Sequence, residues 1–178
     1  MSSSRRSLSF AMEESLERPL ESPHDLLTSG ALNNKSRTAV VCLHQHSSFL
    51  SSITKSTLGD CLKWTIEELL RASHAFARSL AATVVRPGMW ITVFVHNVAE
   101  YHVVFRTSLE LNCIFATLNL KTSMHGKEAK HVIELLNLSV LVAPNVDCGK
   151  KIENAAPEIA ENFLLKLFSQ GNPEGLNS

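Results

Sequence analysis

The sequence predicts an α/β fold in which helices flank a partial, doubly wound and mostly parallel sheet. Apolar runs at residues 90–95, 113–117 and 139–143 alternate with segments that have helical periodicity. The links between these segments are short, which favours right-handed β-α-β crossovers and parallel strands. The run at 90–95 is apolar almost throughout, as expected of a strand that is covered on both faces.

The N-terminal segment lacks the pattern of a folded element. Residues 1–24 are polar and without clear period, and they predict a disordered leader. A short helix over residues 25–34 follows, with Ser22 or Asp25 as its cap. The folded part of the chain is therefore expected to begin near Asp25.

Two short strands are expected on either side of a long loop. Residues 38–43 form a compact β-branched and apolar run, which predicts a buried strand. Residues 45–59 are rich in Ser and Thr and predict a loop. The chain then returns to strand over residues 61–65.

The helix expected from residue 66 to residue 81 has the clearest pattern in the chain. Thr65 precedes it and Glu68 follows three residues later, the arrangement of a capping box. Its apolar stripe falls at three- and four-residue steps. The stripe consists of Ile66, Leu69, Leu70, Ser73, Phe76, Ala77, Leu80 and Ala81.

Further helices are expected between and after the later strands. Asn97 predicts the cap of a second helix, and a third spans residues 126–137. The inner stripe of the second helix is predicted as Tyr101, Val104, Phe105, Ser108 and Leu109. Residues 147–178 predict a helical or irregular tail, with an amphipathic helix over 157–168 that begins at Pro157.

Composition excludes several classes of function. The 17 basic and 17 acidic residues cancel, so no nucleic-acid partner and no anionic membrane surface is expected. No apolar run approaches the ~20 residues of a membrane span. With no secretory signal, a cytoplasmic location and reduced thiols are expected. The thiols are Cys42, Cys61, Cys113 and Cys148.

Four segments in order resemble the start of an AMP-forming adenylate ligase, the family of acyl-CoA synthetases and peptide-synthetase adenylation domains. They are residues 64–69 (Trp-Thr-Ile-Glu-Glu-Leu), 85–88 (Val-Arg-Pro-Gly), 97–101 (Asn-Val-Ala-Glu-Tyr) and 109–120. The last begins Leu-Glu-Leu-Asn-Cys-Ile and ends Thr-Leu-Asn-Leu. The likeness implies that residues 25–146 are the N-terminal part of an AMP-dependent synthetase/ligase domain.

Several positions depart from the family pattern. Ile66 stands at the usual aromatic position, and Met89 replaces an acidic residue. Asn112 stands where the family has Gly and where the helix must end in a left-handed residue, a conformation that Asn also adopts. Thr117 and Leu120 replace two prolines. These matched motifs are scaffold in the family and carry no chemistry.

The resemblance implies a reaction whose machinery is missing from this chain. The family uses ATP, Mg²⁺ and CoA to turn a carboxylate into an acyl-adenylate and then an acyl-CoA. It holds the phosphates with a loop that ends in Gly-x-Pro-Lys-Gly, which this chain lacks. We therefore expect no catalytic, cofactor-binding or metal-binding residues here, and no cofactor bound by this chain alone.

Weaker phosphate-binding patterns also fail. Leu27-Thr28-Ser29-Gly30 opens like such a loop, but no Pro-Lys-Gly follows, so it predicts a helix C-terminus. Gly149-Lys150 resembles the end of a P-loop, but Pro144 replaces the first required Gly. A surface turn that opens a helix is the expected structure there.

Scattered polar residues complete the search. His44 and His46 share a strand face but lack a third metal ligand, so an exposed loop is expected. The other histidines considered are expected on the surface (His74, His131) or beside a helix cap (His96, His102). The basic residues Arg86, Lys121, Lys127 and Lys130 form no stripe. A parallel sheet would place a ligand near the strand ends at His96 and Thr117.

These patterns leave three hypotheses. The first is a truncated AMP-dependent synthetase/ligase domain of acyl-CoA synthetase type that is inactive alone. The second is a non-catalytic interaction module that pairs with itself, a full-length relative or a missing remainder, through an open sheet edge at residues 139–143. The third, an unrelated Rossmann-like domain, lacks a Gly-rich turn after its first strand.

Overall fold

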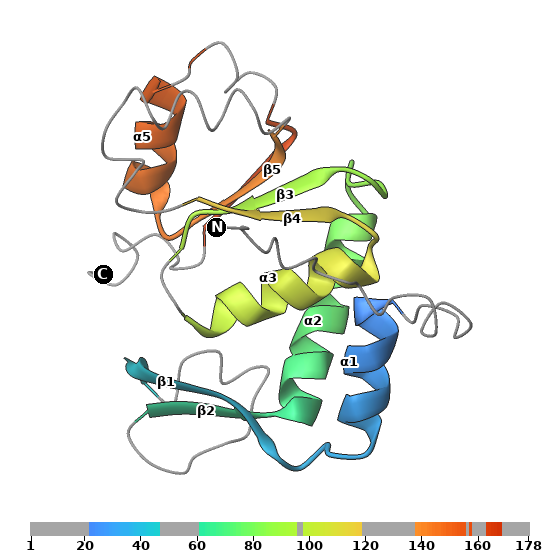
Figure 1. Cartoon of the computed structure of the whole chain (residues 1–178). Helices are drawn as coiled ribbons and strands as arrows, with labels where there is room; N and C mark the ends of the chain where they lie inside the picture. Colours follow the sequence, from blue (N-terminus) through green and yellow to red (C-terminus); the bar gives the residue numbers. More distant parts are fainter. Residues whose placement is uncertain are drawn as a thin grey trace, which may run out of the picture.

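The computed structural model describes residues 22–46, 61–95, 98–118, 138–155, 157 and 163–168. These residues form two sheets joined by packed helices (Figure 1). The smaller sheet pairs β1 (Thr38–His46) with β2 (Cys61–Thr65), and the larger has the strand order β4-β3-β5-β6. Among the described helices none is long and apolar enough to cross a membrane.

The first helix begins slightly earlier than its sequence predicts. Helix α1 spans Pro23–Leu32, and Ser22 caps it by accepting a 3.1 Å hydrogen bond from the Asp25 amide. Of the two predicted caps, Ser22 is therefore the one used. Leu27, Thr28, Ser29 and Gly30 lie within this helix, which excludes a phosphate-binding loop there.

Strand β1 is not the buried strand that its sequence predicts. It pairs antiparallel with β2, with Val41 opposite Lys63 and Cys42 opposite Leu62. Val40 and Cys42 face inward and are buried, whereas Leu43 points outward and is 76% exposed. The prediction fails because a short apolar run in a hairpin can leave one face uncovered. The loop predicted from residue 45 is also too early, since β1 extends to His46.

Helix α2 (Ile66–Ala81) confirms the predicted capping box. The Glu68 amide donates to Thr65 Oγ1, and the Thr65 amide donates to the Glu68 carboxylate. The inward stripe of α2 packs on the hairpin and on α3 (Ala99–Glu110). Trp64, which is 1% exposed, belongs to the cluster of buried residues between the hairpin, α2 and α3.

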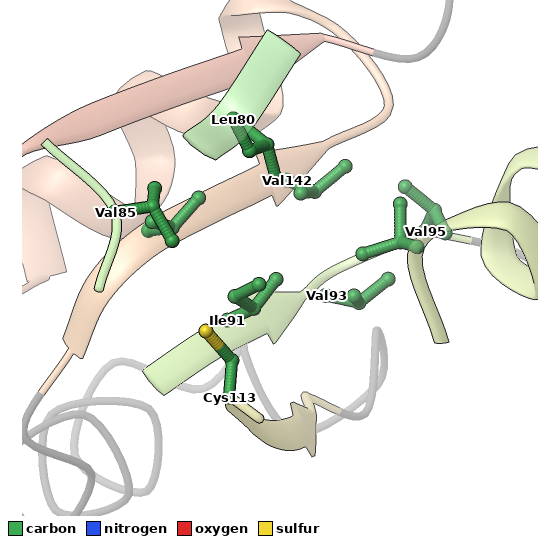
Figure 2. Packing of buried hydrophobic residues seen from close by; sticks show 9 residues of the cluster. Leu80, Val85, Ile91, Val93, Val95, Cys113 and Val142 are labelled. Atoms are coloured by element: carbon green, nitrogen blue, oxygen red, sulfur yellow. The ribbon is translucent and has the colours of Figure 1, made fainter. Parts of the chain in front are cut away.

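The larger sheet is parallel throughout its described strands. Its first three strands in sequence are β3 (Trp90–Val93), β4 (Ile114–Thr117) and β5 (Leu138–Ala143). The predicted apolar run at 90–95 continues past the strand as buried Phe94 and Val95. Figure 2 shows Leu80 of α2 pointing toward Val142, and Cys113 toward Ile91. Burying each large aliphatic side chain here contributes about 1.5–3 kcal/mol.

The chain turns into β4 through a left-handed residue, as the sequence predicts. Asn112 has φ 53° and Gly88 has φ 83°, and the Gly88 amide donates to the Asn112 carbonyl at 2.8 Å. Gly adopts this backbone conformation without strain, and Asn adopts it at a smaller cost than other residues that have a Cβ. Phe115 in β4 then packs edge-on against Tyr101 and Phe105 of α3.

The C-terminal part differs from its prediction. Helix α5 (Val146–Ala155) follows β5, and β6 (Leu165–Phe168) pairs parallel with β5. The predicted helix over 157–168 is therefore wrong at residues 163–168. The predicted open sheet edge at residues 139–143 is also wrong, because β5 pairs with β3 on one side and with β6 on the other. Lys166 of β6 forms a 2.7 Å ion pair with Glu153 of α5. The predicted helix over 126–137 lies outside the described residues.

Candidate functional site

The carboxyl edge of the parallel sheet is where this topology would place a ligand. From β3 the chain crosses through α3 to β4, and from β5 it crosses through α5 to β6 on the other side. Right-handed crossovers in opposite directions put α3 and α5 on opposite faces of the sheet (Figure 1). The strand ends of β3 and β5 therefore flank a topological switch point, where open α/β sheets bind ligands.

The described residues at this switch point are closely packed and mostly apolar. Phe94 is 4% exposed and Ala143 is fully buried. The Phe94 amide donates to the Val142 carbonyl at 2.7 Å, so the backbone groups at the ends of β3 and β5 pair with each other. The Leu118 amide likewise donates to the Val93 carbonyl. Thr117, predicted at this edge, is exposed at the end of β4.

The N-terminus of α3 is capped from a distant strand. Asn97, the predicted cap, lies outside the described residues, and the N-cap position is Val98, which makes no side-chain capping bond. Instead Gln45 of β1 accepts a 2.9 Å hydrogen bond from the Ala99 amide through Oε1. Its Nε2 donates to the Glu100 carboxylate at 2.8 Å. The predicted Asn97 cap is therefore replaced by an interaction between elements.

The N-terminus of α5 is also occupied by the protein itself. Asn145 Oδ1 accepts a 2.9 Å hydrogen bond from the Cys148 amide, and the Gly149 amide bonds the Asn145 carbonyl. Gly149 and Lys150 thus lie inside α5, which begins at Val146, so the predicted surface turn at these two residues is wrong. A P-loop needs backbone amides that converge on a phosphate instead.

The charges at both helix N-termini disfavour an anion. Glu100 lies in the first turn of α3, and Asp147 lies in the first turn of α5. A helix N-terminus attracts phosphate through free amides and a positive dipole end. Here a capping side chain accepts a hydrogen bond from one amide at each helix N-terminus. A carboxylate in the first turn of each helix also offsets the positive end of the helix dipole.

The histidines and cysteines form no catalytic cluster in the described part of the chain. His44 and His46 are exposed in β1 rather than in a loop, and no group of three metal-ligating side chains occurs among the described residues. His74 is exposed, as predicted, and its Nδ1 lies 2.7 Å from Glu110 Oε1. The four cysteines are free thiols, and burial raises the pKa of the Cys42 and Cys113 thiols.

The similar solved structures include a fatty acyl CoA synthetase and an anthranilate CoA ligase. The anthranilate CoA ligase AuaEII, solved with anthranoyl-AMP, matches 89% of this chain with a TM-score of 0.68 at 14% identity. The N-terminal domain of FACL13 from Mycobacterium tuberculosis matches 89% with a TM-score of 0.65 at 14% identity. VinN matches 84% with a TM-score of 0.62 at 20% identity. The chain has the fold of the N-terminal part of an adenylate-forming ligase.

The chain covers only part of the length of each of these similar structures. The chain spans 27% of AuaEII, 36% of the FACL13 domain and 32% of VinN. By sequence alone, no protein-family model and no curated protein matches it significantly. Of the sequence motifs, residues 64–69 lie at the junction between the hairpin and α2, and residues 109–118 run from the end of α3 through β4.

One buried charge was not predicted from the sequence. Arg106 on α3 is 6% exposed, although its neighbours Phe105 and Leu109 were predicted as the inward stripe. Burial lowers the pKa of its guanidinium, and the nearby Glu110 opposes that effect. The sequence carries no local signal for this burial, because it results from α3 packing against α1, α2 and β4 at once.

Proposed function

We propose that this chain is a scaffold portion of an AMP-forming ligase of acyl-CoA synthetase type and has no ligase activity by itself. In the family reaction a carboxylate attacks ATP to give an acyl-adenylate, and the acyl group then passes to CoA. ATP, Mg²⁺ and CoA would be bound only by a longer protein that contains the phosphate loop. The CoA ligases among the similar structures support this type.

The observation that carries the proposal is the state of the two helix N-termini at the switch point. Gln45 and Asn145 accept hydrogen bonds from the amides of Ala99 and Cys148, groups that a phosphate would otherwise bind. Catalysis of adenylation requires donors and cations that neutralise charge on the α-phosphate. The described residues at this edge present carboxylates and apolar side chains instead.

The experiment is ATP–pyrophosphate exchange with the purified chain and a panel of fatty and aromatic acids. A full-length acyl-CoA synthetase assayed in parallel is the positive control. We expect no exchange above the rate without protein for any acid. Saturable exchange with any one acid would overturn the proposal.

A second candidate function is that of an interaction module, favoured by the outer face of the hairpin. Leu43 is 76% exposed and Val41 is 49% exposed, and both lie on β1. Large aliphatic side chains grouped on one exposed strand favour association with another chain. The partner would be a full-length relative, the remainder of a ligase or a second copy.

Light scattering after size-exclusion chromatography tests this second function for the self-association case. Leu43→Lys should convert an oligomer to a monomer, because a charge replaces an apolar contact. Val84→Lys is the matched control, since Val84 is 48% exposed in the turn after α2. A folded wild-type monomer at every concentration, with or without the rest of a ligase added, would contradict the interaction module.

A further inference from the structure

A groove of about 330 Å³ lies away from the sheet edge, between α1, α2 and the start of the hairpin. Helix α1 contributes Leu26 and Leu27, and α2 contributes Leu69 and Leu70. Among the described residues that line the groove, Arg106 of α3 is the one that carries a charge. The volume falls at the small end of ligand pockets, which span about 300–1,000 Å³.

The groove is open to solvent on its apolar side. Leu26 is 56% exposed and Leu27 is 43% exposed, although both belong to the wall of the groove. An added Cβ on Gly30, which also lines the groove, would meet no atom within 4 Å. The apolar wall is therefore accessible, and the space beside α1 is unfilled.

Arg106 has fewer partners than a buried guanidinium requires. Its Nη2 donates to Thr28 Oγ1 at 3.0 Å, while its buried Nε has no hydrogen-bond partner. Among the described residues no carboxylate forms an ion pair with it. A single hydroxyl does not compensate a buried charge.

The nearest acidic group on the same helix is already engaged. Glu110 lies one turn after Arg106, and its Oε1 is 2.7 Å from His74 Nδ1. Its Oε2 is buried without a partner, and the carboxylate forms its ion pair with His74 and not with the guanidinium. Arg106 is thus left as a cation in an apolar groove.

We propose that this groove binds a small monocarboxylate with an apolar body, such as a medium-chain fatty acid. The carboxylate would accept hydrogen bonds from the Arg106 guanidinium, whose planar fork matches a carboxylate. The apolar body would cover the exposed leucines of α1 and the inner leucines of α2. A phosphate fits less well, because one guanidinium among apolar side chains leaves most of its oxygens without donors. This site does not depend on the proposed function.

The test is a titration of the full chain with sodium octanoate, followed by backbone amide NMR shifts and by calorimetry. Octanol serves as the uncharged probe with the same chain length. We expect saturable octanoate binding, with shifts centred on α1 and on Arg106. Octanol should bind about tenfold more weakly, because it lacks the charged hydrogen bond.

Two variants separate the charge from the groove. Arg106→Leu should weaken octanoate binding about tenfold and leave octanol binding unchanged. Gly30→Leu should abolish binding of both probes, because its side chain fills the groove, and it should not weaken α1, since Gly is a poor helix former. Ser29→Leu, one position away on α1 and outside the lining, is the matched control and should bind like wild type.

Three outcomes would overturn the proposal. Octanoate shifts that do not saturate would exclude a site, and equal affinities for octanoate and octanol would exclude a role for the charge. Loss of binding in Ser29→Leu as large as in Gly30→Leu would show that α1, not the groove, is responsible. If Arg106→Leu does not fold, the affinities of octanoate and octanol for the wild-type chain and for Gly30→Leu still test the proposal.

Discussion

His102 shows how a single side chain couples this fold to pH. It is partly buried on α3, with its ring edge-on to Tyr101 at 5.6 Å between centroids. Burial lowers the pKa of its imidazole below the ordinary value of 6.5. At this residue the unfolded chain therefore binds a proton more readily than the folded chain, and the stability that His102 contributes is lost as the pH falls below about 6.5.

His102→Gln should flatten that part of the pH dependence. The free energy of unfolding, measured by urea titration between pH 7.5 and pH 5, should decrease less steeply toward acid in the variant than in wild type. His44→Gln, at an exposed position of β1, is the control and should keep the wild-type slope. Identical slopes for wild type and His102→Gln would contradict the assignment.

Among the described residues, Asn112 is the one non-glycine residue with a positive φ. Its φ of 53° costs an L-residue with a Cβ about 1–2 kcal/mol, which Asn partly avoids. Asn112→Ala should lower the free energy of unfolding by about 1 kcal/mol, while Asn112→Gly should leave it unchanged or raise it slightly. Asn33→Ala is a control at the right-handed C-cap of α1 and should cost less. A tolerated Asn112→Ala would show that the turn relaxes.

Asn112 and Arg106 differ in how far their structure can be predicted from the sequence. The left-handed turn at Asn112 is a local property, set by a helix end and the strand that follows, and it was predicted. The burial of Arg106 depends on α1 packing against α3 across many residues of chain. Helical periodicity alone does not specify which of two neighbouring faces a third helix will cover.

At the scale of elements, Gln45 links the two sheets through the start of α3. One side chain accepts from the Ala99 amide and donates to Glu100, so it joins β1 to α3. Gln45→Ala should lower the free energy of unfolding by about 1–2 kcal/mol, the usual cost of a lost helix cap. Lys63→Ala, exposed on β2, should have little effect. Chemical denaturation of both variants measures the difference, and equal stabilities would show that water replaces Gln45.

The elements differ in how well the sequence predicts them. Helix α2 was predicted closely because capping box, apolar stripe and length agree. The cap of α3 was missed because Gln45 is over fifty residues away from Ala99 in sequence. Strand β6 was mistaken for helix because a segment of only four residues, Leu-Lys-Leu-Phe, is too short to show a helical or strand period. Its pairing with β5 and the Lys166–Glu153 ion pair decide its structure.

At the scale of the whole molecule, order and spacing carried the prediction. The parallel direction of the strands was predicted from apolar runs, short links and right-handed crossovers. The order β4-β3-β5-β6 and the strand β6 itself were not predicted. The carboxyl edge was predicted as the ligand position, but the capping of its helices was not. Gln45 caps α3 through a contact between residues far apart in sequence, and Asn145 caps α5 through a local contact. Among the described residues, both helices that begin at that edge, α3 and α5, have a side chain bonded to an amide of their first turn.

Calorimetric titration of the purified chain with Mg-ATP tests this account most directly. We expect no saturable heat up to millimolar nucleotide, because the amides of Ala99 and Cys148 are already bonded and acidic residues stand beside them. A binding isotherm with micromolar affinity and one nucleotide per chain would contradict it.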